Sequence, residues 1–157
     1  MTIQIVVARY NENINWVKQF PNVVVYNKGI IFDNDYNELT LPNVGREGHT
    51  YYKHICDNYN NLADYTIFLQ GSPFDHSPNI ISNVKKYINN TDLKIDFEFL
   101  SDHIIDLSLN GCDYHPDLPL IKTYESLFGK EKNMKFMKYI KFQFGGGAQF
   151  IVSKKSI

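Results

Sequence analysis

Ile3-Gln4-Ile5-Val6-Val7-Ala8 is the stretch that decides the fold of this 157-residue chain. Its apolar, largely β-branched residues are typical of a strand that is buried on both faces, as in a parallel sheet. A second run of this kind, Val23-Val24-Val25-Tyr26, ends at the turn signal Asn27-Lys28-Gly29. Between the two runs we expect a short helix that Asn11 caps. A strand–helix–strand unit of this size predicts a parallel pair of strands with a right-handed crossover.

The rest of the chain continues this alternation of helices and buried strands. We expect a loop over 30–47, a helix over 48–60, a strand over 65–69, a helix that Ser77 caps with Pro78 in its first position, a helix over 119–128, and short strands over 138–144 and 148–152. The stretch 97–107 fits neither element clearly. The predicted fold is α/β: a single domain over 1–157, built as a three-layer α/β/α sandwich around a mostly parallel sheet.

Composition and charge exclude several classes of protein. An apolar share of 43% indicates a packed domain, and a formal net charge of −1 without a basic stripe argues against nucleic acid as a partner. The N-terminus lacks a signal peptide and no apolar run is long enough to span a bilayer, so we expect a cytoplasmic protein. Cys56 and Cys112 lack metal-site spacing, and each is expected to be a buried free thiol.

Polar residues follow each of the three predicted buried strands. They are the segments 8–12, 27–29 and 70–76, and open α/β sheets bind ligands at the carboxyl ends of their strands. We therefore expect these segments to meet in one cleft for an anionic ligand. Each segment also has a simpler interpretation: Asn11 as a helix cap, Asn27-Lys28-Gly29 as a turn, and Asp75 as a complement to a helix dipole.

The residues that carry this pattern resemble known families. Val6-Val7-Ala8-Arg9-Tyr10-Asn11-Glu12 resembles the opening strand of GT-A glycosyltransferases, and Asn43-Val44-Gly45-Arg46-Glu47, with the strand that follows, resembles the stretch before their metal-binding Asp-x-Asp. Segments in the same order also resemble a family of uncharacterised proteins described as a domain of unknown function. These segments are 7–12, 26–29, 41–51, 57–59, 68–76 and 144–150.

The GT-A resemblance implies roles for residues at each strand end. Ala8, Arg9, Tyr10 and Glu12 are expected to line a nucleotide pocket, with Tyr10 near the base and Glu12 near the ribose. Lys28 is expected at a phosphate and Arg46 at the pyrophosphate, while Asn27, Gln70 and Gly71 complete the predicted binding set.

One departure concerns the metal. Gln70-Gly71-Ser72 stands where the resemblance implies Asp-x-Asp. A Mn²⁺ or Mg²⁺ ion would then need Asp75 and His76 as ligands, because hard cations prefer oxygen-rich, charged sites. The alternative is a metal-free site in which Lys28 and Arg46 offset the diphosphate charge.

The resemblance implies transfer of a sugar from a nucleoside-diphosphate donor to a hydroxyl acceptor on a carbohydrate or protein glycan. Asp75 is our first candidate for the catalytic base and His76 the second, with Asp113 and His115 behind them. A module that binds the nucleotide sugar without catalysis is the alternative. A phosphoester hydrolase ranks last, since the chain has no Gly-x-Ser-x-Gly nucleophile motif.

Overall fold

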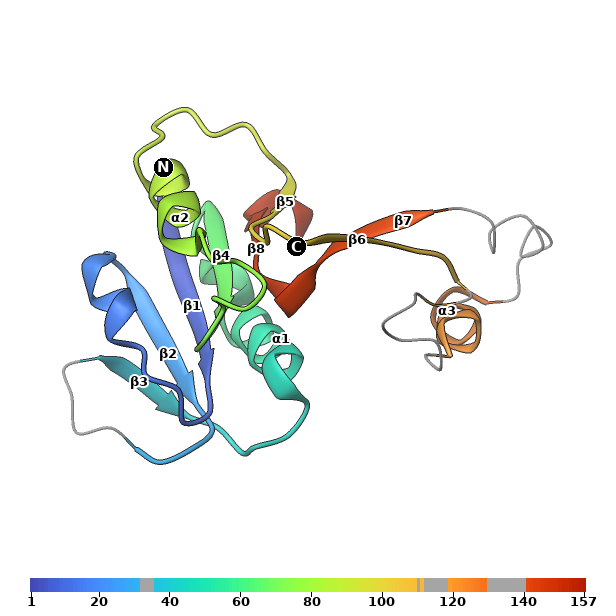
Figure 1. Ribbon diagram of the computed structural model, residues 1–157, viewed down its shortest axis with the longest axis horizontal. Coiled ribbons are helices and arrows are strands. Elements are labelled where there is room, and N and C mark those ends of the chain that lie inside the picture. The colour runs from blue at the N-terminus through green and yellow to red at the C-terminus, as the bar shows by residue number, and fades with distance from the viewer. Residues whose placement is uncertain (32–35, 110, 112–118, 130–140) are drawn as a thin grey trace. The chain divides into compact units, whose positions relative to one another are not determined.

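The chain folds into two compact units. Figure 1 shows the computed structural model, which describes residues 1–31, 36–109, 111, 119–129 and 141–157. Residues 1–103 and 145–157 form what we call the main unit, and residues 104–144 form the inserted unit. No helix within the described ranges is long and apolar enough to cross a membrane.

A six-stranded sheet forms the centre of the main unit. Its order is β3 (Asn37–Thr40), β2 (Val23–Asn27), β1 (Ile3–Arg9), β4 (Tyr65–Gln70), β8 (Phe150–Ser153) and β5 (Phe97–Phe99). The first four strands in this order are parallel, and β8 runs antiparallel to both of its neighbours. The predicted parallel pair of β1 and β2 is therefore confirmed, and so is a mostly parallel central sheet in a mixed α/β domain.

The order of the strands creates a switch point beside β1. The chain passes outward from β1 to β2 and β3, then returns to the opposite side of β1 as β4. Connections that leave two adjacent parallel strands in opposite directions open a crevice at their carboxyl ends, which is where ligands bind in such sheets. The fold thus places a potential ligand site between the ends of β1 and β4.

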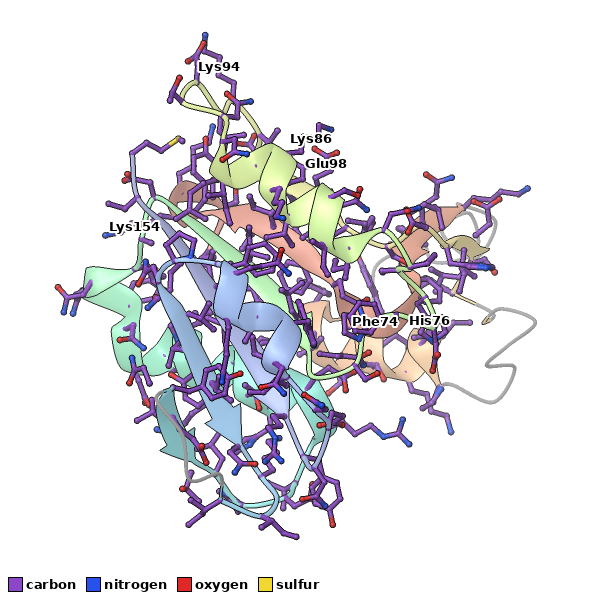
Figure 2. All side chains as sticks on the ribbon, turned by 60° about the vertical axis from the view of Figure 1, so that its left-hand side comes forward. Phe74, His76, Lys86, Lys94, Glu98 and Lys154 are labelled. Carbon is purple, nitrogen blue, oxygen red and sulfur yellow. The ribbon has the colours of Figure 1, made fainter. Side chains whose placement is uncertain are left out.

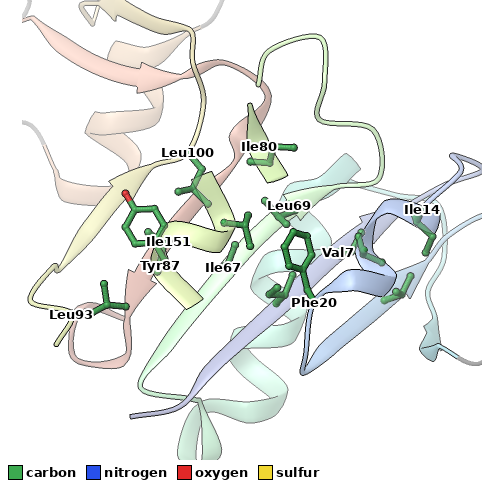
Figure 3. Close-up of a cluster of buried hydrophobic side chains, with 14 residues drawn as sticks. Val7, Ile14, Phe20, Ile67, Leu69, Ile80, Tyr87, Leu93, Leu100 and Ile151 are labelled. Carbon is green, nitrogen blue, oxygen red and sulfur yellow. The ribbon is translucent and has the colours of Figure 1, made fainter. Parts of the chain in front are cut away.

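Alternate residues of β1 pack into two cores on opposite faces of the sheet. Ile5 and Val7 join a cluster with the 3₁₀ helix η1 (Asn15–Gln19) and with α2 (Ile80–Ile88), as Figure 3 shows. Val6 joins a second cluster that α1 (Arg46–Asn58) covers. All three β1 side chains are at most 1% exposed, which explains why the strand reads as a continuous apolar run rather than an alternating one.

The segment between β1 and β2 differs from the prediction. It forms the single 3₁₀ helix η1, and Asn11 does not cap it. The Asn11 Oδ1 atom instead accepts a hydrogen bond from the Ile30 backbone N–H at 2.9 Å. The Asn11 side chain therefore joins the segments after β1 and β2, although the local sequence predicted that it caps a helix.

The starts of two helices also differ from the prediction. The helix expected over 48–60 begins at Arg46 as α1 and ends in a 3₁₀ turn, η2 (Tyr59–Asn61). The helix expected to start at Pro78 begins at Ile80 as α2. Ser77 does not cap it, because the Ser77 Oγ atom is buried and has no hydrogen-bond partner in the described part of the chain.

The two cysteines were expected to be buried, and the structure describes one of them. Cys56 is exposed, so the expectation of a buried thiol is wrong there. The buried stripe of α1 consists of Thr50, Tyr51 and His54, and Cys56 lies off this stripe. Cys112 lies outside the described residues, as do Asp113 and His115.

Several strands were missed or placed differently. The expected loop over 30–47 contains edge strand β3, and the unassigned stretch 97–107 contains β5 and β6 (Ile104–Leu107). The two strands expected around Gly145-Gly146-Gly147 exist as β7 (Phe142–Gly145) and β8, but they belong to different sheets. The turn η3 (Gly146–Ala148) separates them, and residues 138–140 lie outside the described part of the chain.

The inserted unit contains the two-stranded sheet of β6 and β7 and the helix α3 (Leu120–Phe128). The chain leaves the main unit after His103 and returns to it at Gly145. At this point the Gly146 N–H donates to the His103 carbonyl oxygen at 2.8 Å. The two ends of the insertion are thus held together within the main unit itself.

Candidate functional site

One cleft of about 330 Å³ lies at the carboxyl ends of β1, β2 and β4, next to the first turn of α1. Of the residues predicted from sequence, the structure brings together on its wall Ala8, Arg9, Tyr10, Glu12, Lys28, Arg46 and Gln70. The wall also includes Asn43, Glu47 and Ser72, which sequence reasoning did not single out. All three lie in the same quoted motifs as predicted binding residues. Their closeness in sequence to Arg46 or Gln70 was the only feature that could have identified them.

Arg9 ties the segments after β1 and β2 together. Its side chain is 4% exposed, and its guanidinium donates to Asn27 Oδ1 at 2.7 Å, to the Ile30 carbonyl at 2.8 Å and to the Glu12 carbonyl at 3.0 Å. Burial lowers the pKa of Arg9, and the nearby carboxylates of Glu38 and Glu12 oppose this shift. Arg9 therefore positions the cleft wall, whereas the sequence suggested that it contacts the ligand.

Asn27 lies behind the cleft and is completely buried. Its Nδ2 donates to the Ile30 carbonyl at 2.9 Å and to Glu38 Oε1 at 2.7 Å, and its Oδ1 accepts the Gly29 N–H at 2.9 Å. These bonds complete the partners of a carboxamide that would be costly to bury alone. Asn27 shapes the turn after β2 and does not line the cleft, in contrast to its predicted binding role.

Gly29 allows the segments after β1 and β2 to approach each other closely. A Cβ atom at position 29 would lie 1.5 Å from the Tyr10 carbonyl oxygen and 2.3 Å from Asn11 Oδ1. No side chain fits at such distances, so this position requires glycine. The glycine that predicted a turn is therefore also required for the close contact with the segment after β1.

Lys28 connects the end of β2 to the start of α1. Its Nζ donates to the carbonyl oxygens of Val44, at 2.7 Å, and of Arg46. Burial lowers the pKa of Lys28, and the Glu47 carboxylate opposes the shift. The ammonium group thus brings a positive charge to the cleft while it holds the segment that enters α1.

The first turn of α1 faces the cleft with an unusual backbone. Gly45 has φ +61° and Arg46 has φ +47°, and no side chain caps the helix. The N–H groups of a first helical turn lack partners within the helix, and the dipole there favours negative charge. Together with the exposed side chain of Arg46, this turn makes one side of the cleft suitable for an anion.

Tyr10 and Glu12 form the wall contributed by the segment after β1. Tyr10 is 49% exposed, and its backbone N–H donates to Glu12 Oε2 at 2.6 Å. A Cβ at Gly71 would lie 2.7 Å from Glu12 Oε2. Gly71 does not line the cleft, but its lack of a side chain lets Glu12 lie between the ends of β1 and β4.

Asp75 and His76 do not lie on the cleft wall. Both are exposed on the turn that follows β4, where Figure 2 labels Phe74 and His76. The His76 carbonyl accepts from Ser101 Oγ at 3.0 Å, and a Cβ at Gly146 would lie 3.2 Å from His76 Nδ1. At His76 the turn therefore packs against Ser101 and Gly146, which do not line the cleft.

The same placement decides how well the residues fit a metal ion. Among the described residues, no three or more His, Cys, Asp or Glu side chains lie close enough together to hold one. Asp75 and His76 have no third ligand beside them there, and a divalent cation needs several hard donors. Within the described part of the chain, Asp75 and His76 thus lack the further donors that a Mn²⁺ or Mg²⁺ site requires.

Comparison with known proteins identifies the family. None of the curated proteins and none of the solved structures matches the chain. A family model described as "Protein of unknown function (DUF3431)" matches residues 5–96. This span includes most of β1, all of β2 and β4 and the first turn of α1, and therefore the whole cleft wall. Since this match covers more than half of the chain, the protein belongs to the DUF3431 family.

Proposed function

We propose that the cleft binds the diphosphate and nucleoside of a nucleotide sugar, and that the protein transfers the sugar to a hydroxyl acceptor. One observation carries the proposal. Polar residues from the ends of three parallel strands and the uncapped first turn of α1 share one cleft at the switch point of the sheet. This arrangement, with α1 on one face of the sheet and α2 on the other, also agrees with a GT-A-like sandwich.

Each part of a nucleotide sugar has a partner of suitable chemistry on the wall. Arg46 and the N–H groups of the first turn of α1 suit the diphosphate, since both offer positive potential. The half-exposed ring of Tyr10 suits the flat face of a base, and the Glu12 carboxylate suits the ribose hydroxyls. In this proposal Lys28 acts on the diphosphate through its charge, because two carbonyls already accept from its ammonium group.

The transfer itself is a displacement at the anomeric carbon of the sugar. The acceptor oxygen forms a bond to that carbon, the bond to the diphosphate oxygen breaks, and the nucleoside diphosphate leaves with the electron pair. A base takes the proton of the acceptor hydroxyl from about 3 Å away. Asp75 and His76 remain our candidates for this base, and Glu12 and Glu47 are the carboxylates on the cleft wall.

Binding is tested first. Isothermal titration with UDP, GDP and their hexose conjugates, with EDTA and separately with Mn²⁺, is expected to give saturable binding of at least one nucleotide. Arg46→Met is expected to weaken that binding at least tenfold, whereas Lys85→Met on the exposed face of α2 leaves it unchanged. Lack of binding across the whole panel would exclude the proposal.

The second candidate is a module that binds the nucleotide sugar without transferring it. The position of Asp75 and His76 off the cleft wall favours this alternative. Donor hydrolysis or transfer that is lost in Asp75→Ala supports the enzyme. Binding without any turnover, and equal in Asp75→Ala, supports the module.

A further inference from the structure

Gln149 is an unusual residue for a protein core. Its side chain is 0% exposed, and it lies between η3 and β8. Its Nε2 donates to Gln70 Oε1 at 3.3 Å, but its own Oε1 has no hydrogen-bond partner in the described part of the chain. A buried carboxamide with an unpaired oxygen destabilises a protein, so hydrophobic packing does not explain this residue.

The backbone around Gln149 is shaped to hold this side chain. A Cβ at Gly147 would lie 2.6 Å from Gln149 Oε1 and 2.8 Å from its Nε2, and Gly147 has φ +76°, where a glycine is favoured. The Gln149 carbonyl accepts the Leu100 N–H at 2.9 Å, which fixes the backbone from the side of β5. The carboxamide of Gln149 is therefore held in one place.

This fixed donor determines which way the Gln70 carboxamide faces. Gln70 is the last residue of β4 and lines the cleft. Because Gln149 holds the Oε1 atom of Gln70, the Nε2 atom on the other side of the same planar group is the one that Gln70 can offer to a ligand. In this orientation a neutral side chain supplies two N–H donors to a cleft that the first turn of α1 also lines.

We infer that Gln149 is a positioning residue that makes Gln70 a hydrogen-bond donor to an anionic oxygen of the ligand. This inference rests on the proposed function, and it names the diphosphate as the part of the ligand that Gln70 binds. Glu12 and Glu47 present only acceptors to the cleft when ionised, so the donor at position 70 also offsets their repulsion of the anion. Recognition then depends on the polarity of one carboxamide that a buried neighbour orients.

Reversing this polarity provides the test. Gln70→Glu keeps the size of the side chain and still accepts from Gln149, but it presents an acceptor to the cleft. Titration of the full chain with UDP and GDP in EDTA is expected to give a dissociation constant at least tenfold higher than wild type. Gln19→Glu adds the same charge on exposed η1 and is expected to bind as wild type does.

A second variant separates positioning from stability. Gln149→Met removes the donor and the unpaired oxygen together, so its melting temperature is expected to equal or exceed that of wild type while binding weakens three- to tenfold. Wild-type affinity in Gln70→Glu, or a loss of melting temperature without a loss of affinity in Gln149→Met, would overturn the inference. If wild type binds no member of the full nucleotide and nucleotide-sugar panel described above, the proposed function fails and the inference fails with it.

Discussion

Replacing Arg9 by methionine tests the idea that this side chain holds the cleft wall together. Methionine fills a similar length of space without a charge. The change removes the donors to Asn27 Oδ1, to the Ile30 carbonyl, to the Glu12 carbonyl and, at 3.3 Å, to the Tyr10 carbonyl. We expect a less stable protein whose segment 10–12 no longer packs against the end of β2.

The magnitude follows from which acceptors keep another donor. Asn27 Oδ1 retains the Gly29 N–H, and the Ile30 carbonyl retains Asn27 Nδ2. The carbonyls of Tyr10 and Glu12 lose the guanidinium from part-buried hydrogen bonds, and an acceptor left without its partner costs about 1–3 kcal/mol when it is shielded from water. Since the Tyr10 bond is long, we expect a total loss of about 3 kcal/mol, which lowers the melting temperature by about 6–12 °C in a protein of this size.

Urea unfolding followed by circular dichroism measures this change. Lys85→Met removes one positive charge from an exposed position on α2 and serves as the control, with an expected change within about 0.5 kcal/mol. Arg9→Lys is expected to behave like Arg9→Met, because an ammonium group cannot reproduce the fork of a guanidinium. A loss below about 1 kcal/mol in Arg9→Met would refute the reasoning, since a single unsatisfied carbonyl already accounts for that much.

Three further predictions concern other parts of the main unit. Burial lowers the pKa of His54, so as the pH falls through about 6.5 the unfolded chain binds a proton that the folded chain resists. The free energy of unfolding should therefore fall between about pH 7 and pH 5, and urea titration should show a less steep fall in His54→Gln. Gly29→Ala places a Cβ 1.5 Å from the Tyr10 carbonyl oxygen and is expected to lower the free energy of unfolding by more than about 3 kcal/mol. A melting temperature near that of wild type would contradict this prediction. Gly147→Ala combines a φ of +76° with a clash against Gln149 and is expected to cost about 1–2 kcal/mol and to weaken UDP binding; unchanged calorimetric affinity would argue against the clash.

The strands and their shared edge were predictable from the sequence. Runs such as Val23–Tyr26 have apolar residues at every position because both faces of the sheet are covered, and this pattern does not depend on distant parts of the chain. Parallel strands bring their carboxyl ends to one edge, so the meeting of Tyr10, Lys28 and Gln70 followed from the order of elements alone.

The partners of the polar side chains were not predictable in the same way. Asn11 has the local signature of a helix cap, yet its carboxamide bonds to Ile30, which lies across the sheet edge. Lys28 reaches carbonyls at positions 44 and 46, and Arg9 is buried although its position at a strand end suggests exposure. Such choices depend on distances between segments that are far apart in the sequence.

The path of the chain after β4 was not predictable from the sequence either. The order Gln70-Gly71-Ser72-Pro73-Phe74-Asp75-His76 places polar and turn-forming residues, with one phenylalanine, at and after the end of β4, without indicating where the chain leaves the cleft. The first and third line the cleft, whereas Asp75 and His76 do not. Segment 144–150 carried the family resemblance, but nothing in it predicted the burial of Gln149, because glutamine is mostly an exposed residue.

The bond between His103 and Gly146 has a consequence for how this architecture tolerates change. His103 and Gly146, which flank the inserted unit, both belong to the main unit and are joined by a hydrogen bond of 2.8 Å. The number of residues between them can therefore change while the ends of the insertion stay in place. Closing a longer or shorter loop across fixed ends changes the entropy of folding only slowly with length. This junction is therefore a natural site at which a linker, a tag or another domain can replace residues 104–144 without disturbing the strand order.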